Sequence, residues 1–217
     1  MSLKKAYILI FIILLIDQIS KIYIKTHFVL GEEVVVFNWF KILFIENEGM
    51  AWGTQIPGSY GKIILTLFRL VAVTGIAYWL WDAVKKRSSN FLIVAIALIF
   101  AGAFGNIIDS VFYGVMFDDS HHNLATYFSN KPYGTLFHGK VVDMFYFPII
   151  QNGHFPSWFP IWGGEEFEFF RPVFNFADAS ISVGVITLFI FQNKFFGKEN
   201  DENVEKEQIE APVGNPE

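Results

Sequence analysis

Four long apolar stretches constrain this chain more than any other feature of its sequence. They lie at approximately residues 6–24, 63–81, 91–108 and 173–191, with only a few polar interruptions in each. A helix that crosses a lipid bilayer needs about 20 predominantly apolar residues, and a helix satisfies its own backbone hydrogen bonds in lipid. We therefore predict an all-α membrane protein with four transmembrane helices, together with an outer β-rich segment and a long outer loop.

The composition agrees with a membrane protein and excludes several other classes. Charged residues make up 17% of the 217 residues, against about 25% in soluble domains, which argues against a hydrophilic enzyme, a nucleic-acid-binding protein or a disordered chain. The net charge of −5 arises in residues 198–217, where seven acidic residues outnumber two lysines. We predict a membrane domain over residues 1–197 and a disordered acidic cytoplasmic tail over residues 198–217. The absence of cysteine excludes disulfides and thiolate chemistry.

The basic residues predict the orientation of the helices. Cytoplasmic loops carry an excess of Lys and Arg. Seven such residues flank the predicted helices on one side: Lys4, Lys5, Lys85, Lys86, Arg87, Lys194 and Lys198. Both termini are therefore expected in the cytoplasm, with residues 25–61 and 113–171 outside. The first stretch could instead be a cleaved signal peptide, but no cleavage site with small residues follows it, which favours a helix that is retained.

Ionisable and amide side chains interrupt the apolar stretches at similar depths. A rise of 1.5 Å per residue places them in the middle to outer part of the bilayer: Asp17, Lys21, Arg69, Asn106, Asp109 and Asp178. A charge in hydrocarbon costs at least about 2.5–3.5 kcal/mol, so such groups normally face the bundle interior and serve function. The spacing Asn-x-x-Asp occurs twice, at 106–109 and 175–178, which strengthens the prediction of a shared polar site.

Converging carboxylates favour acid–base chemistry. Two aspartates a few ångströms apart share one proton, so one can accept a proton from an attacking water while the other donates. Such a pair would cleave an amide without a metal or other cofactor. Two alternatives stay open: a small proton-coupled transporter and a non-catalytic membrane scaffold. A Ser–Lys protease built on Ser20, Lys21 and Ser180 is disfavoured because the sequence has no nucleophile-turn signature.

Five motifs occur in an order that resembles one membrane protease family. They are DQISK (17–21), NEGMAWG (47–53), GAFGNIID (102–109), VVDMF (141–145) and FNFAD (174–178). This order is similar to that of lipoprotein signal peptidase, the bacterial signal peptidase II, over about residues 5–195. The resemblance implies a four-helix aspartyl protease of the bacterial cytoplasmic membrane, with its active site near the outer face and no cofactor.

The same resemblance implies roles for individual residues. The family's catalytic pair corresponds to Asp143 and Asp178, and Asp143 is selected by the resemblance alone. Further positions match residues that support the pair or the substrate: Asp17, Lys21, Asn47, Gly49, Ala51, Asn106, Asp109 and Asn175. The implied substrate is a prolipoprotein whose cysteine carries diacylglycerol, cleaved on the amino side of that cysteine. Membrane lipid and globomycin-type inhibitors are the other ligands that the family implies.

Simpler roles stay open for several of these residues. Asp17 and Lys21 have the spacing of an i,i+4 ion pair that stabilises a helix. Asn106 and Asn175 could hydrogen-bond helices to one another, a role compatible with orienting a catalytic pair. Small residues in the NEGMAWG motif could simply allow a tight turn.

The chain departs from the family pattern at two places. Ser110 follows GNIID where the family usually has arginine, and Arg69 and Arg171 are the candidates to replace that cation. The stretch between the aspartates of GNIID and VVDMF is longer than in typical members, which suggests an added lid or partner surface. It contains DDSHHN (118–123). His121 and His122 could suggest a metal site, but adjacent strand side chains point to opposite faces, which favours a solvated loop.

Overall fold

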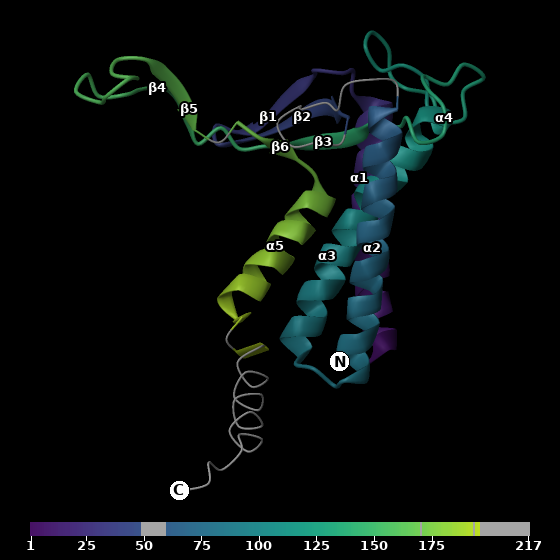
Figure 1. Ribbon diagram of the computed structural model, residues 1–217. Coiled ribbons are helices and arrows are strands. Elements are labelled where there is room, and N and C mark those ends of the chain that lie inside the picture. The colour runs from purple at the N-terminus through teal and green to yellow at the C-terminus, as the bar shows by residue number, and fades with distance from the viewer. Residues whose placement is uncertain (49–59, 170, 193, 196–217) are drawn as a thin grey trace, which may run out of the picture.

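The helices form a bundle with a small antiparallel sheet at one end (Figure 1). The computed structural model describes residues 1–48, 60–169, 171–192, 194 and 195, so Gly49, Ala51 and the predicted tail lie outside the described residues. Within these ranges three helices are long and apolar enough to cross a membrane: α1 (Leu3–His27), α2 (Gly61–Lys85) and α3 (Asn90–Ile108), which continues to Met116. A shorter apolar helix, α5 (Phe176–Ile190), packs against α3.

The predicted apolar helices are present, with a correction at the fourth. Its predicted start at residue 173 is wrong, because Val173–Phe174 form strand β6 and α5 begins at Phe176. Asn175 is the N-cap between them, so Asp178 lies in the first turn of a short helix. The third helix extends beyond its predicted end at residue 108 through a π-helical turn, η2 (Asp109–Tyr113), and the short helix α4 (Gly114–Met116).

A sheet joins the two outer segments, so the fold is a membrane-helix bundle with a sheet and "all-α" is too narrow a description. The strand order is β1 (Glu33–Phe37), β2 (Phe40–Asn47), β3 (Val141–Tyr146) and β6, and every pair is antiparallel. Strands β1 and β2 agree with the prediction of a β-rich segment over residues 25–61. Strands β4 (Ile150–His154) and β5 (Glu166–Phe169) form a separate hairpin.

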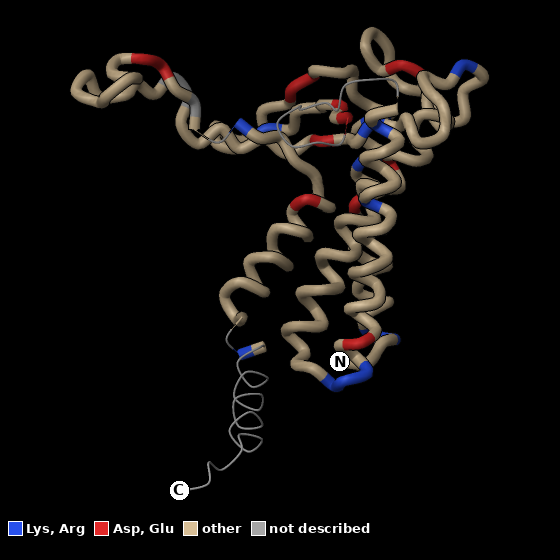
Figure 2. The backbone as a smooth tube through the Cα atoms, in the orientation of Figure 1, with Lys and Arg blue, Asp and Glu red and all other residues tan. Residues whose placement is uncertain are grey.

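Two main clusters of buried apolar side chains lie at different levels of the bundle. One packs α1, α2 and α3 together: Ala6, Ile10, Leu80, Ala83, Leu92, Ile93, Ile96, Ala97 and Ala101. The other packs the end of α1 against the sheet and the extension of α3: Ile24, Phe44, Tyr113, Phe117, Ala125, Val142 and Met144. Figure 2 shows few charged residues along the middle of the helices. Many large apolar side chains on the outer faces of the helices are exposed, as contact with lipid requires.

Glycine lets α3 and α5 approach closely beside the predicted site. A Cβ atom at Gly102 would lie 2.2 Å from the backbone oxygen of Ala177, so Gly102→Ala forces the two backbones apart. We expect this substitution to lower the stability by about 1–3 kcal/mol, as overpacking does, and to lower activity because Ala177 adjoins Asp178. Thermal unfolding and cleavage assays check both effects. Gly75→Ala in α2 is the matched control, since its Cβ meets nothing within 4 Å, and an equal loss there would contradict the explanation.

Candidate active site

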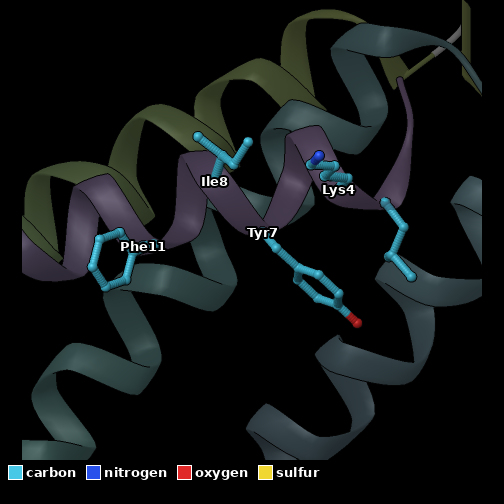
Figure 3. A pocket seen from close by; sticks show the side chains of 5 residues that line it. Lys4, Tyr7, Ile8 and Phe11 are labelled. Atoms are coloured by element: carbon cyan, nitrogen blue, oxygen red, sulfur yellow. The ribbon is translucent and has the colours of Figure 1, made fainter.

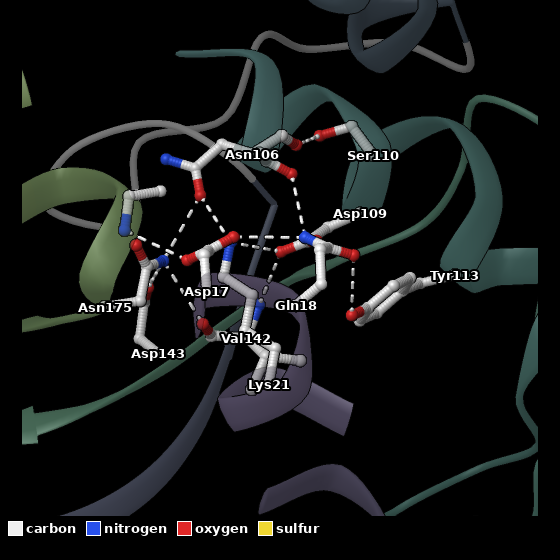
Figure 4. A network of polar contacts seen from close by, with 12 residues as sticks. Asp17, Gln18, Lys21, Asn106, Asp109, Ser110, Tyr113, Val142, Asp143 and Asn175 are labelled. Carbon is white, nitrogen blue, oxygen red and sulfur yellow. Dashed lines mark hydrogen bonds and ion pairs between the residues drawn. The ribbon is translucent and has the colours of Figure 1, made fainter. Parts of the chain in front are cut away.

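Two aspartates meet where the sheet joins the bundle. Asp143 lies in the middle of β3 and is 3% exposed, and Asp178 is half-buried in the first turn of α5. Strand β6 pairs with β3 through Phe174 and Phe145 and leads through Asn175 into α5. This connection brings two carboxylates that are distant in the sequence into one polar network, most of which is drawn in Figure 4.

Asn175 contacts both aspartates. Its Nδ2 donates to Oδ1 of Asp143 at 2.7 Å, and its Oδ1 accepts from the backbone N–H of Asp178 at 2.9 Å. Oδ2 of Asp178 accepts in return from the backbone N–H of Asn175 at 3.3 Å, which completes a capping box. Asn is among the preferred N-cap residues. The N-cap residue of α5 therefore also fixes the two carboxylates relative to each other.

Asn106 of α3 connects the aspartates to a group of buried charges. Its Nδ2 donates to Oδ1 of Asp178 at 2.8 Å. Its Oδ1 accepts from Nδ2 of Asn175 at 3.2 Å and from Nζ of Lys21 at 2.8 Å. The predicted role as a bond between helices and the predicted role beside the pair are therefore both compatible with its contacts.

Lys21 is fully buried and lies between two carboxylates of neighbouring helices. Its Nζ is 2.9 Å from Oδ2 of Asp17 and 2.8 Å from Oδ2 of Asp109. With Asn106 these partners use all three N–H groups of the ammonium, which is how a buried charge is tolerated. The i,i+4 pair with Asp17 is present. The Ser–Lys alternative is wrong, because these three acceptors occupy Lys21 and none of them is a serine.

Asp17 also reaches the beginning of α5. Its Oδ1 accepts a hydrogen bond from the backbone N–H of Ala177 at 2.9 Å. The first N–H groups of a helix have no partner within the helix and carry a partial positive charge, so a carboxylate stabilises them. Gly105 makes room for this contact, because a Cβ there would lie 2.7 Å from Oδ2 of Asp17. The position of Asp178 therefore depends on a residue of the first helix.

Gln18 and Tyr113 belong to the network, and sequence reasoning missed both. Nε2 of Gln18 donates to Oδ2 of Asp17 at 3.0 Å and to Oδ1 of Asp109 at 2.9 Å. The hydroxyl of Tyr113 donates to Oε1 of Gln18 at 3.2 Å. The sequence offered two hints: Gln18 lies inside the DQISK motif, and Tyr113 lies one helical turn beyond Asp109. The π-helical turn over 109–113, a feature often found at functional sites, has no signature in the sequence.

Asn47 completes the surroundings of Asp143 from β2. Its Nδ2 donates to Oδ2 of Asp143 at 3.3 Å. Burial, and then the negative charge of Asp178, raise the pKa of Asp143 to about 7, while hydrogen bonds from Asn47 and Asn175 oppose that rise. A carboxyl group with a pKa near 7 can change its protonation state near neutral pH, which acid–base catalysis requires. The other predicted residues of this motif, Gly49 and Ala51, lie outside the described residues.

The side chain that stands in place of the family's arginine makes a local contact within its own helix. Oγ of Ser110 donates to the backbone oxygen of Asn106 at 2.9 Å. The cation beside Asp109 is Lys21 of α1. Arg69 of α2 is close enough to Asp178 for their charges to interact, and among the described residues its Nη1 is buried without a hydrogen-bond partner. Arg171 is exposed.

A second buried ion cluster attaches the long outer segment to α1. Nζ of Lys25 pairs with Glu46 and donates to Oγ of Ser120 at 2.9 Å, and Nζ of Lys140 lies 3.2 Å from Oε2 of Glu46. Burial would raise the pKa of Glu46, but the two lysines outweigh it and hold this pKa below its usual value. The cluster adjoins Asn47 in β2. The beginning and end of the segment from 117 to 140 are therefore fixed to the body of the protein, and sequence reasoning missed this contact.

The remaining polar loop and the apolar pocket lie apart from this network. His121 and His122 are exposed, and Nδ1 of His121 is 2.6 Å from Oδ1 of Asp119. Across the described part of the chain, no group of three or more His, Cys, Asp or Glu is arranged to hold a metal ion. A pocket on the first turns of α1 is lined by mostly apolar side chains (Figure 3): Leu3, Lys4, Tyr7, Ile8 and Phe11. It contains no carboxylate, so we do not assign it to the active site.

Comparison with known proteins decides the family. The model of the family described as signal peptidase (SPase) II matches residues 9–194. The chain belongs to the signal peptidase II family. The lipoprotein signal peptidase of Porphyromonas gingivalis is 53% identical over 184 residues, which cover 84% of this chain and 80% of that protein. The lipoprotein signal peptidase of Amoebophilus asiaticus is 35% identical over 188 residues, covering 83% and 74%.

Solved structures agree with this assignment at the level of the fold. A bacterial membrane enzyme solved by the in meso method at 1.9 Å resolution has a TM-score of 0.57 and is 25% identical, covering 87% of this chain and 92% of its own. A second one, solved at 2.3 Å, has the same TM-score at 22% identity and covers 99% and 96%. As a signal peptidase II the chain is an aspartic endopeptidase and a multi-pass membrane protein. The transporter and scaffold alternatives are therefore set aside.

Proposed function

We propose that Asp143 and Asp178 are the catalytic pair with which this signal peptidase II removes signal peptides from prolipoproteins. The observation that carries the proposal is the contrast between the carboxylates of the network. Lys21 forms an ion pair with both Asp17 and Asp109, whereas the side-chain hydrogen bonds to Asp143 and Asp178 come from neutral amides of the described residues. Carboxylates held by neutral donors can exchange protons, while carboxylates paired with a buried cation serve to hold the structure together.

The proposed reaction uses water as the nucleophile. Ionised Asp178 takes a proton from the water that attacks the scissile carbonyl carbon, and protonated Asp143 gives its proton to the carbonyl oxygen. When the tetrahedral intermediate collapses, Asp178 returns a proton to the leaving amine and Asp143 regains one from the hydroxyl group. The raised pKa of Asp143 supports this assignment of roles, as does the greater exposure of Asp178 to water.

The proposed substrate is a prolipoprotein whose cysteine carries diacylglycerol, cut on the amino side of that cysteine. We place the enzyme in the bacterial cytoplasmic membrane, with both termini in the cytoplasm and the pair near the outer face. In support, α1 begins and α5 ends at the same end of the bundle, away from the sheet (Figure 1). In this proposal residues 1–197 form the peptidase domain, Gly49 and Ala51 frame the substrate, and residues 198–217 are an acidic tail.

The activity is tested with the purified full chain in detergent and a diacylglyceryl-modified prolipoprotein. We expect mass spectrometry of the products to show a single cut before the modified cysteine, and no cut in the precursor that lacks the lipid. The Porphyromonas gingivalis relative serves as the positive control. If that relative cleaves the substrate and this chain does not, the proposal is wrong.

The pH dependence of cleavage tests the role of Asp143 as the acid. Because the pKa of Asp143 is about 7, its proton is lost as the pH rises through neutrality, and kcat/KM should fall on that side of the profile. The hydrogen bond from Asn47 favours the ionised carboxylate, so Asn47→Ala should raise this pKa and move the basic limb of kcat/KM to higher pH. Asn123→Ala, an exposed asparagine of the outer loop, is the control. A basic limb that stays in place in Asn47→Ala would contradict the assignment.

A further inference from the structure

The hairpin of β4 and β5 projects from the molecule, unlike the other long outer segment. The segment from 117 to 140 contributes Phe117 and Ala125 to the buried cluster under the sheet. In contrast, β4 and β5 pack chiefly on each other, and Figure 1 shows them extending sideways from the sheet, away from the helices. We call residues 149–169 the aromatic arm.

The tip of the aromatic arm is apolar and exposed, and it has contacts within itself. Residues 155–164 read FPSWFPIWGG and contain no charged side chain. Trp158 is 78% exposed and Ile161 is 86% exposed. Phe155 stacks on Phe159 with ring centroids 5.3 Å apart, and the backbone N–H of Gly164 donates to the oxygen of Phe155 at 3.0 Å. The tip is therefore a defined turn that presents apolar side chains outward.

The backbone of this turn is strained at one residue and crowded at another, and this conformation directs apolar side chains outward. Ile161 has a φ of 78°, an unusual value for a β-branched residue. Gly163 is required by the turn, because a Cβ there would lie 2.7 Å from the backbone oxygen of Ser157. Strained residues persist where the surroundings over-determine them and are concentrated at functional positions. Here the strain holds an isoleucine almost fully exposed.

The direction of the arm points to the bilayer as its partner. Helices α1, α2 and α3 are long and apolar enough to cross a membrane, and the arm extends sideways from the sheet, across the direction of these helices and at the level of the sheet (Figure 1). It therefore lies along the membrane surface. Helix α5 also exposes apolar side chains such as Val183 and Ile186. These side chains form part of the bundle surface that faces lipid. Trp side chains are enriched at this depth because their rings are both apolar and polar.

We propose that the aromatic arm inserts Trp158, Ile161 and Trp162 into the lipid–water interface at the sheet end of the bundle. Glu165 and Glu166, which follow the tip at the start of β5 and lie opposite Phe155 and His154, are exposed and stay in water, as in interfacial segments that bury one apolar face. Along the chain, the arm connects β3, which carries Asp143, to β6 and Asp178. If the arm is held at a fixed depth in the interface, it also sets the height of the two aspartates relative to the bilayer, where they meet a lipid-anchored substrate.

The absence of cysteine from the chain permits a direct test with single spin labels in the full-length protein. Ile161→Cys and Trp158→Cys report on the tip in lipid nanodiscs of phosphatidylethanolamine and phosphatidylglycerol. Phe68→Cys, on the exposed face of α2, is the reference for lipid, and His122→Cys in the exposed outer loop is the reference for water. Collisions with oxygen, which enters lipid, are compared with collisions with a water-soluble nickel chelate.

We expect both tip labels to give an oxygen-to-nickel ratio several-fold above that of His122→Cys and closer to that of Phe68→Cys. The ratio at position 161 should fall towards the water reference when Trp158 and Trp162 are both replaced by Ser. A tip label as accessible to nickel as His122→Cys would overturn the proposal. Protection from both reagents would also overturn it, because it would show a protein contact at the tip. None of these results depends on cleavage, so the proposed catalytic pair can fail without affecting this test.

Discussion

Replacing Asp143 or Asp178 with Asn will lower the rate of prolipoprotein cleavage by about 10²–10⁴-fold, the usual contribution of a general acid or base. Asn keeps the size of the side chain but can neither accept the proton of water nor carry a proton to the carbonyl oxygen. The loss should appear mainly in kcat, measured with saturating substrate in detergent, because the surrounding asparagines still hold the substituted side chain.

A matched control separates this effect from unfolding. Asp119→Asn makes the same chemical change at an exposed outer carboxylate whose side chain contacts His121, and it should leave cleavage unchanged. The unfolding temperatures of the two inactive variants should stay close to that of the parent. Substantial activity in either variant would mean that the pair is misassigned, whereas a large fall in unfolding temperature would show that the carboxylate is structural.

The helices were predictable because lipid imposes a length on apolar segments. This rule located the three long helices and the shorter helix α5, but it could not find the start of α5, because Val173 and Phe174 are as apolar as the helix that follows. Only their pairing with β3 makes them a strand. The π-helical turn at Asp109 escaped prediction for a similar reason, since it depends on packing against other segments.

The charge cost of the bilayer predicted only part of the site. Depth selected six residues, and the structure joins five of them, Asp17, Lys21, Asn106, Asp109 and Asp178, in one network. The sixth, Arg69, is close enough to Asp178 for their charges to interact. Asp143 lies in a strand of the outer segment, and the depth argument applies only to residues within the membrane-spanning helices. The resemblance supplied it, and the pairing of β3 with β6 explains why it belongs there.

Contacts between distant segments were beyond the sequence. Lys25, Glu46 and Ser120 come from three different parts of the chain, and no spacing within the sequence relates them. The same applies to the hydrogen bond from Ala177 to Asp17. The contact with Ala177 links α1 to α5, which carries Asp178, and the contact with Glu46 links α1 to β2, the strand that pairs with β3 beside Asp143. The first helix therefore serves as a support on which the site is assembled.

Lys21→Met should therefore be the most destabilising substitution in this helix. Met has a similar length and no charge, so it leaves Asp17 and Asp109 buried together without a cation. Removing one partner of a buried ion pair typically costs about 3–5 kcal/mol, and we expect thermal unfolding in detergent to show a loss of this size. Lys86→Met is the matched control, because Lys86 and Asp82 form an i,i+4 pair of the same 2.9 Å length that is exposed, and exposed pairs contribute about 0–1 kcal/mol.

A second substitution tests whether the loss comes from uncompensated charge or from lost packing. Adding Asp109→Asn to Lys21→Met removes one of the two stranded carboxylates, so the double variant should regain part of the stability although it has lost more polar contacts than the single one. Cleavage should stay low in both, because Asn106 loses the ammonium that orients its amide toward Asp178. If the double variant is less stable than Lys21→Met alone, the network stabilises the fold through packing, and charge compensation is not its main contribution.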